Sequence, residues 1–71
     1  MIDAKPGKLY RLVTKYHWGG RTEMDALVWY RGYSEYAERY YFLAITGTHT
    51  GYITLRFNEM GKRHRYVLKP L

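Results

Sequence analysis

Three histidines are the first residues to examine for catalysis or metal binding, and their spacing supports neither. His17, His49 and His64 are far apart, and no pair has the spacing that places two ligands on one helical turn. No glycine-rich phosphate loop, nucleophile motif or close pair of acids accompanies them. His49 lies in a glycine-bounded segment, residues 47–51, that a hairpin loop explains without chemistry. We therefore expect no metal, no cofactor and no enzymatic activity.

Arginine and tyrosine offer a different chemistry. Twelve Lys and Arg residues against six Asp and Glu residues give a net charge of +6, which favours anionic partners such as nucleic acid or an acidic protein surface. Nine Tyr, two Trp and two Phe make up 18% of the chain. A small core does not absorb that many rings, so some of them must reach the surface, where tyrosine is well tolerated.

Length and composition indicate the size of the domain and the compartment in which these side chains act. A chain of 71 residues fits one small basic β-domain that spans residues 1–71. It contains no cysteine, which rules out a disulfide framework and favours a reducing compartment. No segment has the apolar length of a signal peptide or a membrane span. We therefore expect a cytoplasmic protein that does not associate with membranes.

Short β-strands must position the arginines and the rings. Residues 8–18 alternate between two kinds of side chain and predict a strand, and residues 40–46, 52–57 and 64–69 predict three more, joined by loops of hairpin length. Residues 22–32 fit a helix, because Thr22 and Asp25 resemble a capping box, or a strand, which we favour because residues 26–30 are β-rich. The predicted fold class is mainly β: a small five-stranded antiparallel barrel or bent sheet of SH3-like or OB-like size, with the option of one short helix near residues 34–38.

The alternation in residues 52–57 sets which side chains face the core. Ile53, Leu55 and Phe57 are apolar and alternate with more polar neighbours, so we expect them to face inward. Pairing core positions with core positions then predicts two consecutive hairpins. The inward residues of the preceding and following strands would be Tyr41, Leu43, Ile45, His64, Tyr66 and Leu68, and the first strand would add Tyr10 and Tyr16.

The same register predicts a binding surface on the opposite face, where Phe42, Arg56 and Arg65 form one row. Opposed arginines repel, so an anion is expected to neutralise them, and rings beside them can stack on unpaired bases. The sequence therefore predicts a non-catalytic module that binds single-stranded nucleic acid, DNA or RNA, through a basic aromatic sheet face. The predicted phosphate ligands are Arg56, Arg63, Arg65 and Lys69, and the predicted stacking rings are Phe42, Tyr52 and Tyr40.

Other interpretations of the same residues stay open. The arginines can belong to a solvated strand face, where Glu38 and Glu59 would pair with them. Tyrosine, tryptophan and arginine also dominate protein interfaces, so a small inhibitor or adaptor of the phage or mobile-element type, docking on an acidic protein surface, is the main rival. A structural subunit of an assembly, or a homodimer, would use the same rings and strand edges.

Overall fold

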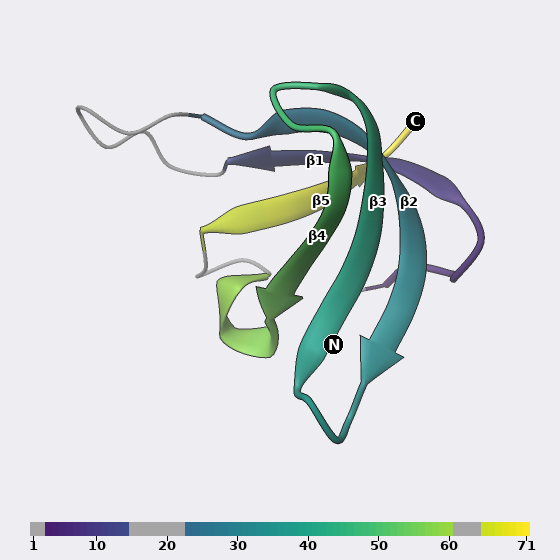
Figure 1. The fold of residues 1–71 in the computed structure, drawn as a ribbon, viewed down its shortest axis with the longest axis vertical. Coiled ribbons are helices and arrows are strands. Elements are labelled where there is room, and N and C mark those ends of the chain that lie inside the picture. Colours follow the sequence, from purple (N-terminus) through teal and green to yellow (C-terminus); the bar gives the residue numbers. More distant parts are fainter. Residues whose placement is uncertain (1–2, 15–22, 61–64) are drawn as a thin grey trace.

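The described residues form one open antiparallel sheet. The computed structural model describes residues 3–14, 23–60 and 65–71. Its strands are β1 (Leu9–Thr14), β2 (Asp25–Ser34), β3 (Arg39–Gly47), β4 (Gly51–Arg56) and β5 (Tyr66–Pro70), in the order β4-β3-β2-β1-β5 (Figure 1). The predicted five-stranded antiparallel sheet is confirmed. Because β4 and β5 do not pair, the sheet is not closed.

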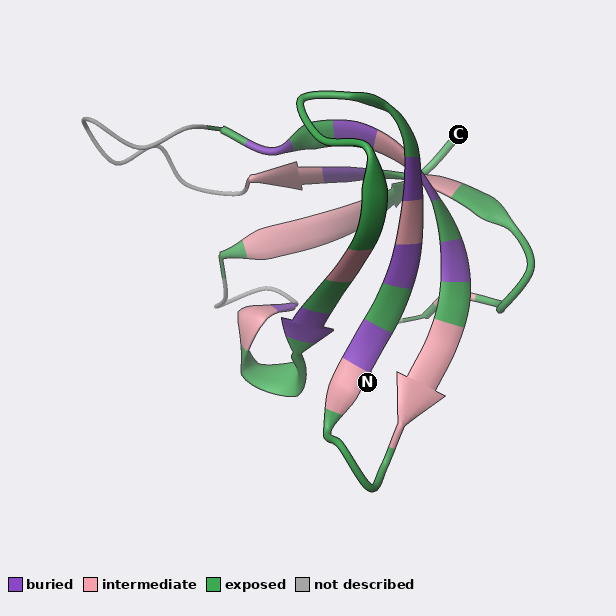
Figure 2. Cartoon of the chain, viewed as in Figure 1, coloured by how far each residue is buried: buried purple, intermediate pink, exposed green. Residues whose placement is uncertain are grey.

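Strand β2 resolves the choice between helix and strand in residues 22–32. Ala26, Val28 and Tyr30 are buried, whereas the residues between them are exposed or half-buried. This period of two belongs to a strand with one face on the core. Figure 2 shows the same alternation along β2 and β3. Strand β1 corresponds to the first part of the strand predicted for residues 8–18. Residues 15–18 lie outside the described residues.

The connection between β2 and β3 is a turn and not the short helix considered for residues 34–38. The Ser34 hydroxyl accepts a hydrogen bond from the Ala37 backbone N–H at 3.2 Å. Glu38 then adopts a φ of 53°, a left-handed conformation that a helix cannot continue through. In the described part of the chain the only helical element is the 3₁₀ turn η1 (Phe57–Glu59). No helix there is long and apolar enough to cross a membrane.

Two irregularities bend β2 around the core. The β2–β3 register shifts between Leu27 and Val28 and again between Tyr30 and Gly32. Such bulges bend a strand and increase its twist. Gly32 has a φ of 125°, which glycine adopts readily and other residues rarely do. The bend lets β1 and β5 run across the direction of β3 and β4 in Figure 1, so that one sheet can enclose a core.

The second predicted hairpin, from β4 to β5, is wrong. After β4 the chain enters η1, where the Arg56 backbone N–H donates to Glu59 Oε1 at 3.0 Å, and β5 then pairs with β1 through Leu12 and Leu68. The two strands that were expected to be neighbours are therefore the two edges of the sheet. Met60 follows η1 and contacts Tyr66 through an isolated parallel bridge.

The core lies on one face of the bent sheet and corrects the predicted register of β3. Phe42 is 0% exposed and Tyr40 is 3% exposed, so neither can be a surface ring. Tyr41, which was expected in the core, is 37% exposed, and Phe57 is 51% exposed in η1. The buried residues are Leu12, Met24, Ala26, Val28, Tyr30, Tyr40, Phe42, Ala44, Leu55 and Met60. Tyr10 and Tyr66 pack against them as predicted, and Tyr16 lies outside the described residues.

Candidate nucleic-acid interface

The outer face of the sheet, turned away from the core, carries a row of rings across three strands. Trp29 on β2 is the register partner of Leu43 on β3, which is the partner of Tyr52 on β4. Trp29 is 39% exposed and Tyr52 is 80% exposed. Tyr41 lies two residues from Leu43 on the same strand, hence on the same face. Three partly or fully exposed rings therefore gather on adjacent strands.

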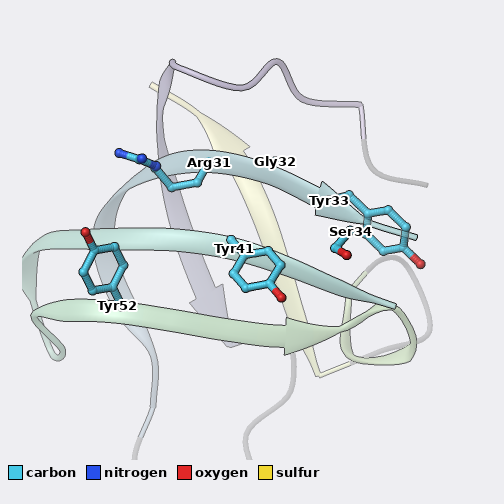
Figure 3. A pocket seen from close by; sticks show the side chains of 6 residues that line it. All are labelled: Arg31, Gly32, Tyr33, Ser34, Tyr41 and Tyr52. Atoms are coloured by element: carbon cyan, nitrogen blue, oxygen red, sulfur yellow. The ribbon is translucent and has the colours of Figure 1, made fainter. Parts of the chain in front are cut away.

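The bulge in β2 adds a cation to these rings. Arg31 is the extra residue between the paired positions Tyr30 and Gly32. Its guanidinium carbon lies 5.4 Å from the centroid of the Trp29 ring, which is a cation–π distance. Figure 3 shows Arg31 extending along β2 toward the end of the sheet where Tyr52 lies, with Tyr41 between the strands. An open hollow beside them is lined by Arg31, Gly32, Tyr33, Ser34, Tyr41 and Tyr52.

Two further arginines continue the same face toward the β2–β3 turn. Arg39 and Arg56 are register partners on β3 and β4. Each stands next to a buried residue, Tyr40 or Leu55, so both project from the outer face. Directly opposed like charges destabilise a sheet, and here no described carboxylate forms an ion pair with either guanidinium. We call Trp29, Arg31, Arg39, Tyr41, Tyr52 and Arg56 the outer patch.

An arginine on the opposite side of the outer face is paired with a carboxylate. Arg11 on β1 donates from Nε and Nη2 to the two carboxylate oxygens of Asp25 on β2, at 2.8 and 2.7 Å. These hydrogen bonds, together with the charges of Arg11 and Lys69, lower the pKa of Asp25. Neither Arg31 nor the Arg39–Arg56 pair has such a partner among the described residues. Among the arginines on β1 to β4, Arg11 is thus the one with a described carboxylate partner, and the other three belong to the outer patch.

The structure brings together only part of the predicted site. Tyr52 and Arg56 lie on the outer face, as expected. Lys69 is exposed but lies on β5, beside Arg11 and two strands away from the patch. Arg65 precedes β5, so its predicted row with Arg56 does not exist.

The remaining predicted residues do not contribute to this surface. Phe42 and Tyr40 point into the core, because β3 has the opposite register from the one predicted. Arg63 lies outside the described residues.

Four members of the outer patch were not predicted: Trp29, Arg31, Arg39 and Tyr41. A usable signal existed for Trp29, because it alternates in phase with the charged residues Asp25 and Arg31, and charges rarely face a core. No comparable signal existed for Tyr41. Its neighbours on both sides are also aromatic, so alternation cannot show which side faces outward.

The histidine in the β3–β4 loop has a structural environment. His49 Nδ1 lies 3.0 Å from Thr48 Oγ1, which in turn accepts the Asp25 backbone N–H at 3.0 Å. Within residues 3–14, 23–60 and 65–71, no three His, Cys, Asp or Glu side chains are grouped so that they could hold a metal ion.

No protein-family model, no curated protein and no solved structure matches this chain.

Proposed function

We propose that the outer patch binds single-stranded nucleic acid. The observation that carries the proposal is the combination, on one sheet face, of three exposed rings with three guanidiniums that no described carboxylate neutralises. Phosphate oxygens accept charge-assisted, often bidentate hydrogen bonds from arginine. Aromatic side chains stack on bases of any sequence, because every base has a π-face. The absence of cysteine supports a cytoplasmic location for this activity.

The rings favour a single strand over a duplex. In a duplex both faces of each base are already stacked on neighbouring bases, so Trp29, Tyr41 and Tyr52 would have no face to contact. Along β3, two residues separate Tyr41 from the Trp29–Tyr52 row, which corresponds to about 7 Å. Arg39 lies a further two residues along. A single strand that follows β3 would therefore meet rings first and the arginine pair afterwards.

Stacking is tested with the most exposed ring of the patch. Binding of a short fluorescent single-stranded oligonucleotide is followed by anisotropy at low salt. We expect Tyr52→Ala to weaken binding by about 1–3 kcal/mol, the usual contribution of one stacked base. The matched control is Tyr36→Ala, because Tyr36 is fully exposed in the β2–β3 turn and does not belong to the patch. An equal loss of affinity in the two variants would exclude a stacking role for Tyr52.

Phosphate contacts are tested by the salt dependence of the same binding. Each phosphate contact contributes about 0.7 to the slope of log affinity against log salt for a single strand. Arg31→Gln and Arg56→Gln should each reduce that slope. Arg11→Gln removes the same charge from the same face, but from a residue paired with Asp25, and should leave the slope unchanged. If all three variants behave alike, the charge acts only through the net charge of the protein.

A protein-binding module is the second candidate, because apolar side chains also reach the outer face. Leu9 is 42% exposed and Ile45 is 45% exposed. Such residues add little to phosphate binding but are typical of protein interfaces. Leu9→Ser combined with Ile45→Ser should leave oligonucleotide binding intact if the patch serves nucleic acid. Recovery of one dominant acidic protein after nuclease treatment, and its loss in this double variant, would favour the rival function.

A further inference from the structure

A second hollow lies where the outer patch ends. Its lining residues come from the β2–β3 turn, the adjoining ends of β3 and β4, and η1: Ala37, Glu38, Arg39, Arg56, Phe57 and Asn58. The Glu38 carbonyl accepts a hydrogen bond from the Phe57 backbone N–H at 3.1 Å, which ties the turn to η1. The hollow is therefore built from connected backbone segments.

The arginine pair in this hollow is suited to a dianion. Arg39 and Arg56 are directly opposed on neighbouring strands, where Cα atoms are about 4.5–5.5 Å apart. Neither has a described carboxylate partner. A phosphodiester within a nucleic-acid strand carries one negative charge, whereas a terminal phosphate monoester carries close to two at pH 7, since its second pKa is about 6. Two facing guanidiniums match the monoester better than the diester.

Acidic residues beyond the arginine pair indicate that a bound strand ends here. Glu35 and Glu38 lie in the β2–β3 turn, and Glu59 lies in η1. Glu38 lines the same hollow as the arginines, and Glu59 Oε1 accepts a hydrogen bond from the Arg56 backbone N–H at 3.0 Å. Further backbone phosphates on this side would be repelled. The positive surface therefore has a negatively charged border behind the arginines.

The hollow also offers groups for the base of a terminal nucleotide. The Phe57 ring is 51% exposed in η1 and provides a stacking surface. Asn58 follows it and carries an amide that can both donate and accept a hydrogen bond. Two cations, a ring and an amide thus line one small depression, together with Ala37 and Glu38 of the turn.

We propose that Arg39 and Arg56 bind the terminal phosphate of the single strand that the outer patch holds, so that the protein recognises a phosphorylated strand end. This inference rests on the proposed function and gives it a preferred substrate. The strand would lie along β3 with its phosphorylated end at the β2–β3 turn. Whether that end is the 5′ or the 3′ end is decided by the experiment below.

Three forms of one short oligonucleotide test the proposal: a 5′-phosphate, a 3′-phosphate and no terminal phosphate. We expect one phosphorylated form to bind about tenfold more tightly than the unphosphorylated form, a factor that corresponds to about 1.4 kcal/mol. Arg39→Gln and Arg56→Gln should each abolish this preference, while Arg11→Gln preserves it. Inorganic phosphate should remove the tenfold preference for the phosphorylated form without displacing the unphosphorylated form. This competition distinguishes a site for the bare anion from a site for the strand end.

A fourth oligonucleotide tests the charge argument with the unaltered protein, so the result does not depend on the folding of a variant. Its terminal phosphate is capped as a methyl ester, which leaves one negative charge. It should bind less tightly than the form with the free terminal phosphate. If the unphosphorylated oligonucleotide binds and Tyr52→Ala weakens it, but neither phosphate changes the affinity, the terminal-phosphate proposal fails and the proposed function stands. If no form binds at low salt, both fail.

Discussion

Tyr30 shows how burial changes the chemistry of a single tyrosine in this molecule. It is 4% exposed and packs against Phe42, with ring centroids 5.4 Å apart. Burial raises the pKa of its phenol, and the neighbouring phenols of Tyr40 and Tyr10 raise it further. Folding therefore favours the neutral form. The resulting contribution to stability is complete below the unfolded pKa of about 10 and is lost as the pH rises through the folded-state pKa.

Tyr30→Phe should reduce the sensitivity of the fold to alkali. The variant keeps the ring and removes the titrating hydroxyl, so it should lose less stability than the parent protein between about pH 8 and about pH 11. Urea denaturation followed by circular dichroism at both pH values measures the difference. Tyr36→Phe serves as the control, since Tyr36 is fully exposed and should not alter the alkaline loss. Identical behaviour of the two variants would contradict the prediction.

Asp25 gives the corresponding prediction in acid. Hydrogen bonds from Arg11, with smaller contributions from the charges of Arg11 and Lys69, lower its pKa. The ion pair therefore stabilises the fold above the ordinary pKa of about 3.9, and this contribution is lost as the pH falls below it. Asp25→Asn should lower the thermal midpoint slightly at neutral pH. The further decrease of the midpoint in acid should be smaller in this variant than in the parent protein. The effect is small because both side chains are about half exposed. An unchanged acid-induced decrease would exclude the pair as its source.

Gly47 sets the geometry at the end of the β2–β3 pair. Its φ is 116°, and a Cβ there would lie 2.3 Å from the Asp25 carbonyl oxygen and 2.7 Å from Ala26 Cα. That close approach accompanies a hydrogen bond from the Thr48 N–H to the same Asp25 carbonyl, at 3.1 Å. Backbone contact and backbone conformation thus both require glycine.

Gly47→Ala should destabilise the protein more than Gly51→Ala. Gly51 also has a positive φ, of 95°, but a Cβ there meets no atom within 4 Å. The Gly51 variant should therefore show only the conformational cost, about 1–3 kcal/mol. The Gly47 variant adds a clash with backbone atoms that cannot move aside independently. Urea denaturation compares the two, and a smaller loss in Gly47→Ala would show that the β3–β4 loop relaxes easily.

How far the sequence predicts the fold depends on how clearly each strand alternates. In β4, Ile53 and Leu55 differ plainly from Tyr52 and Arg56, and the predicted inward and outward faces are confirmed. In β3, residues 40–45 are apolar or aromatic at every position, so alternation gives no register. The prediction matched Tyr41, Leu43 and Ile45 to the inward residues of β4, whereas the structure places Tyr40 and Phe42 opposite Leu55 and Ile53. The other predicted pairing was a hairpin between β4 and β5. That pairing was wrong because β5 instead completes the sheet beside β1, a non-local contact that short-range patterns do not encode.

The candidate site, like the fold, could be predicted from the sequence only in part. The idea of two opposed arginines on an aromatic sheet face was derived from Arg56, but its partner across the strands is Arg39 and not Arg65. Arg31, whose guanidinium lies over the Trp29 ring, is the extra residue of a bulge between Tyr30 and Gly32. Isolated glycine in a strand is compatible with a bulge but does not specify one. Positions that depend on register across strands or on a bulge therefore required the structure.

For the whole molecule, the distribution of charge gives the outer face a direction. Near β1 and β5, Arg11 is paired with Asp25 and Lys69 is exposed. The three arginines of the outer patch lie across β2, β3 and β4 without such a partner in the described part of the chain, and acidic residues lie at the β2–β3 turn. A net charge of +6 attracts any polyanion from a distance. Only the patch combines that charge with exposed rings among the described residues, so it is where a single strand should be held.

The most direct test of this account is a heteronuclear NMR titration of the protein with a short single-stranded oligonucleotide at about 50 mM salt, where phosphate contacts are strong. The indole N–H of Trp29, assigned with Trp29→Phe, and the backbone amides around Tyr41 and Tyr52 should shift. The amides of β5 should remain in place. Shifts confined to β1 and β5, or no shifts at all, would contradict the assignment of the outer patch as a nucleic-acid interface.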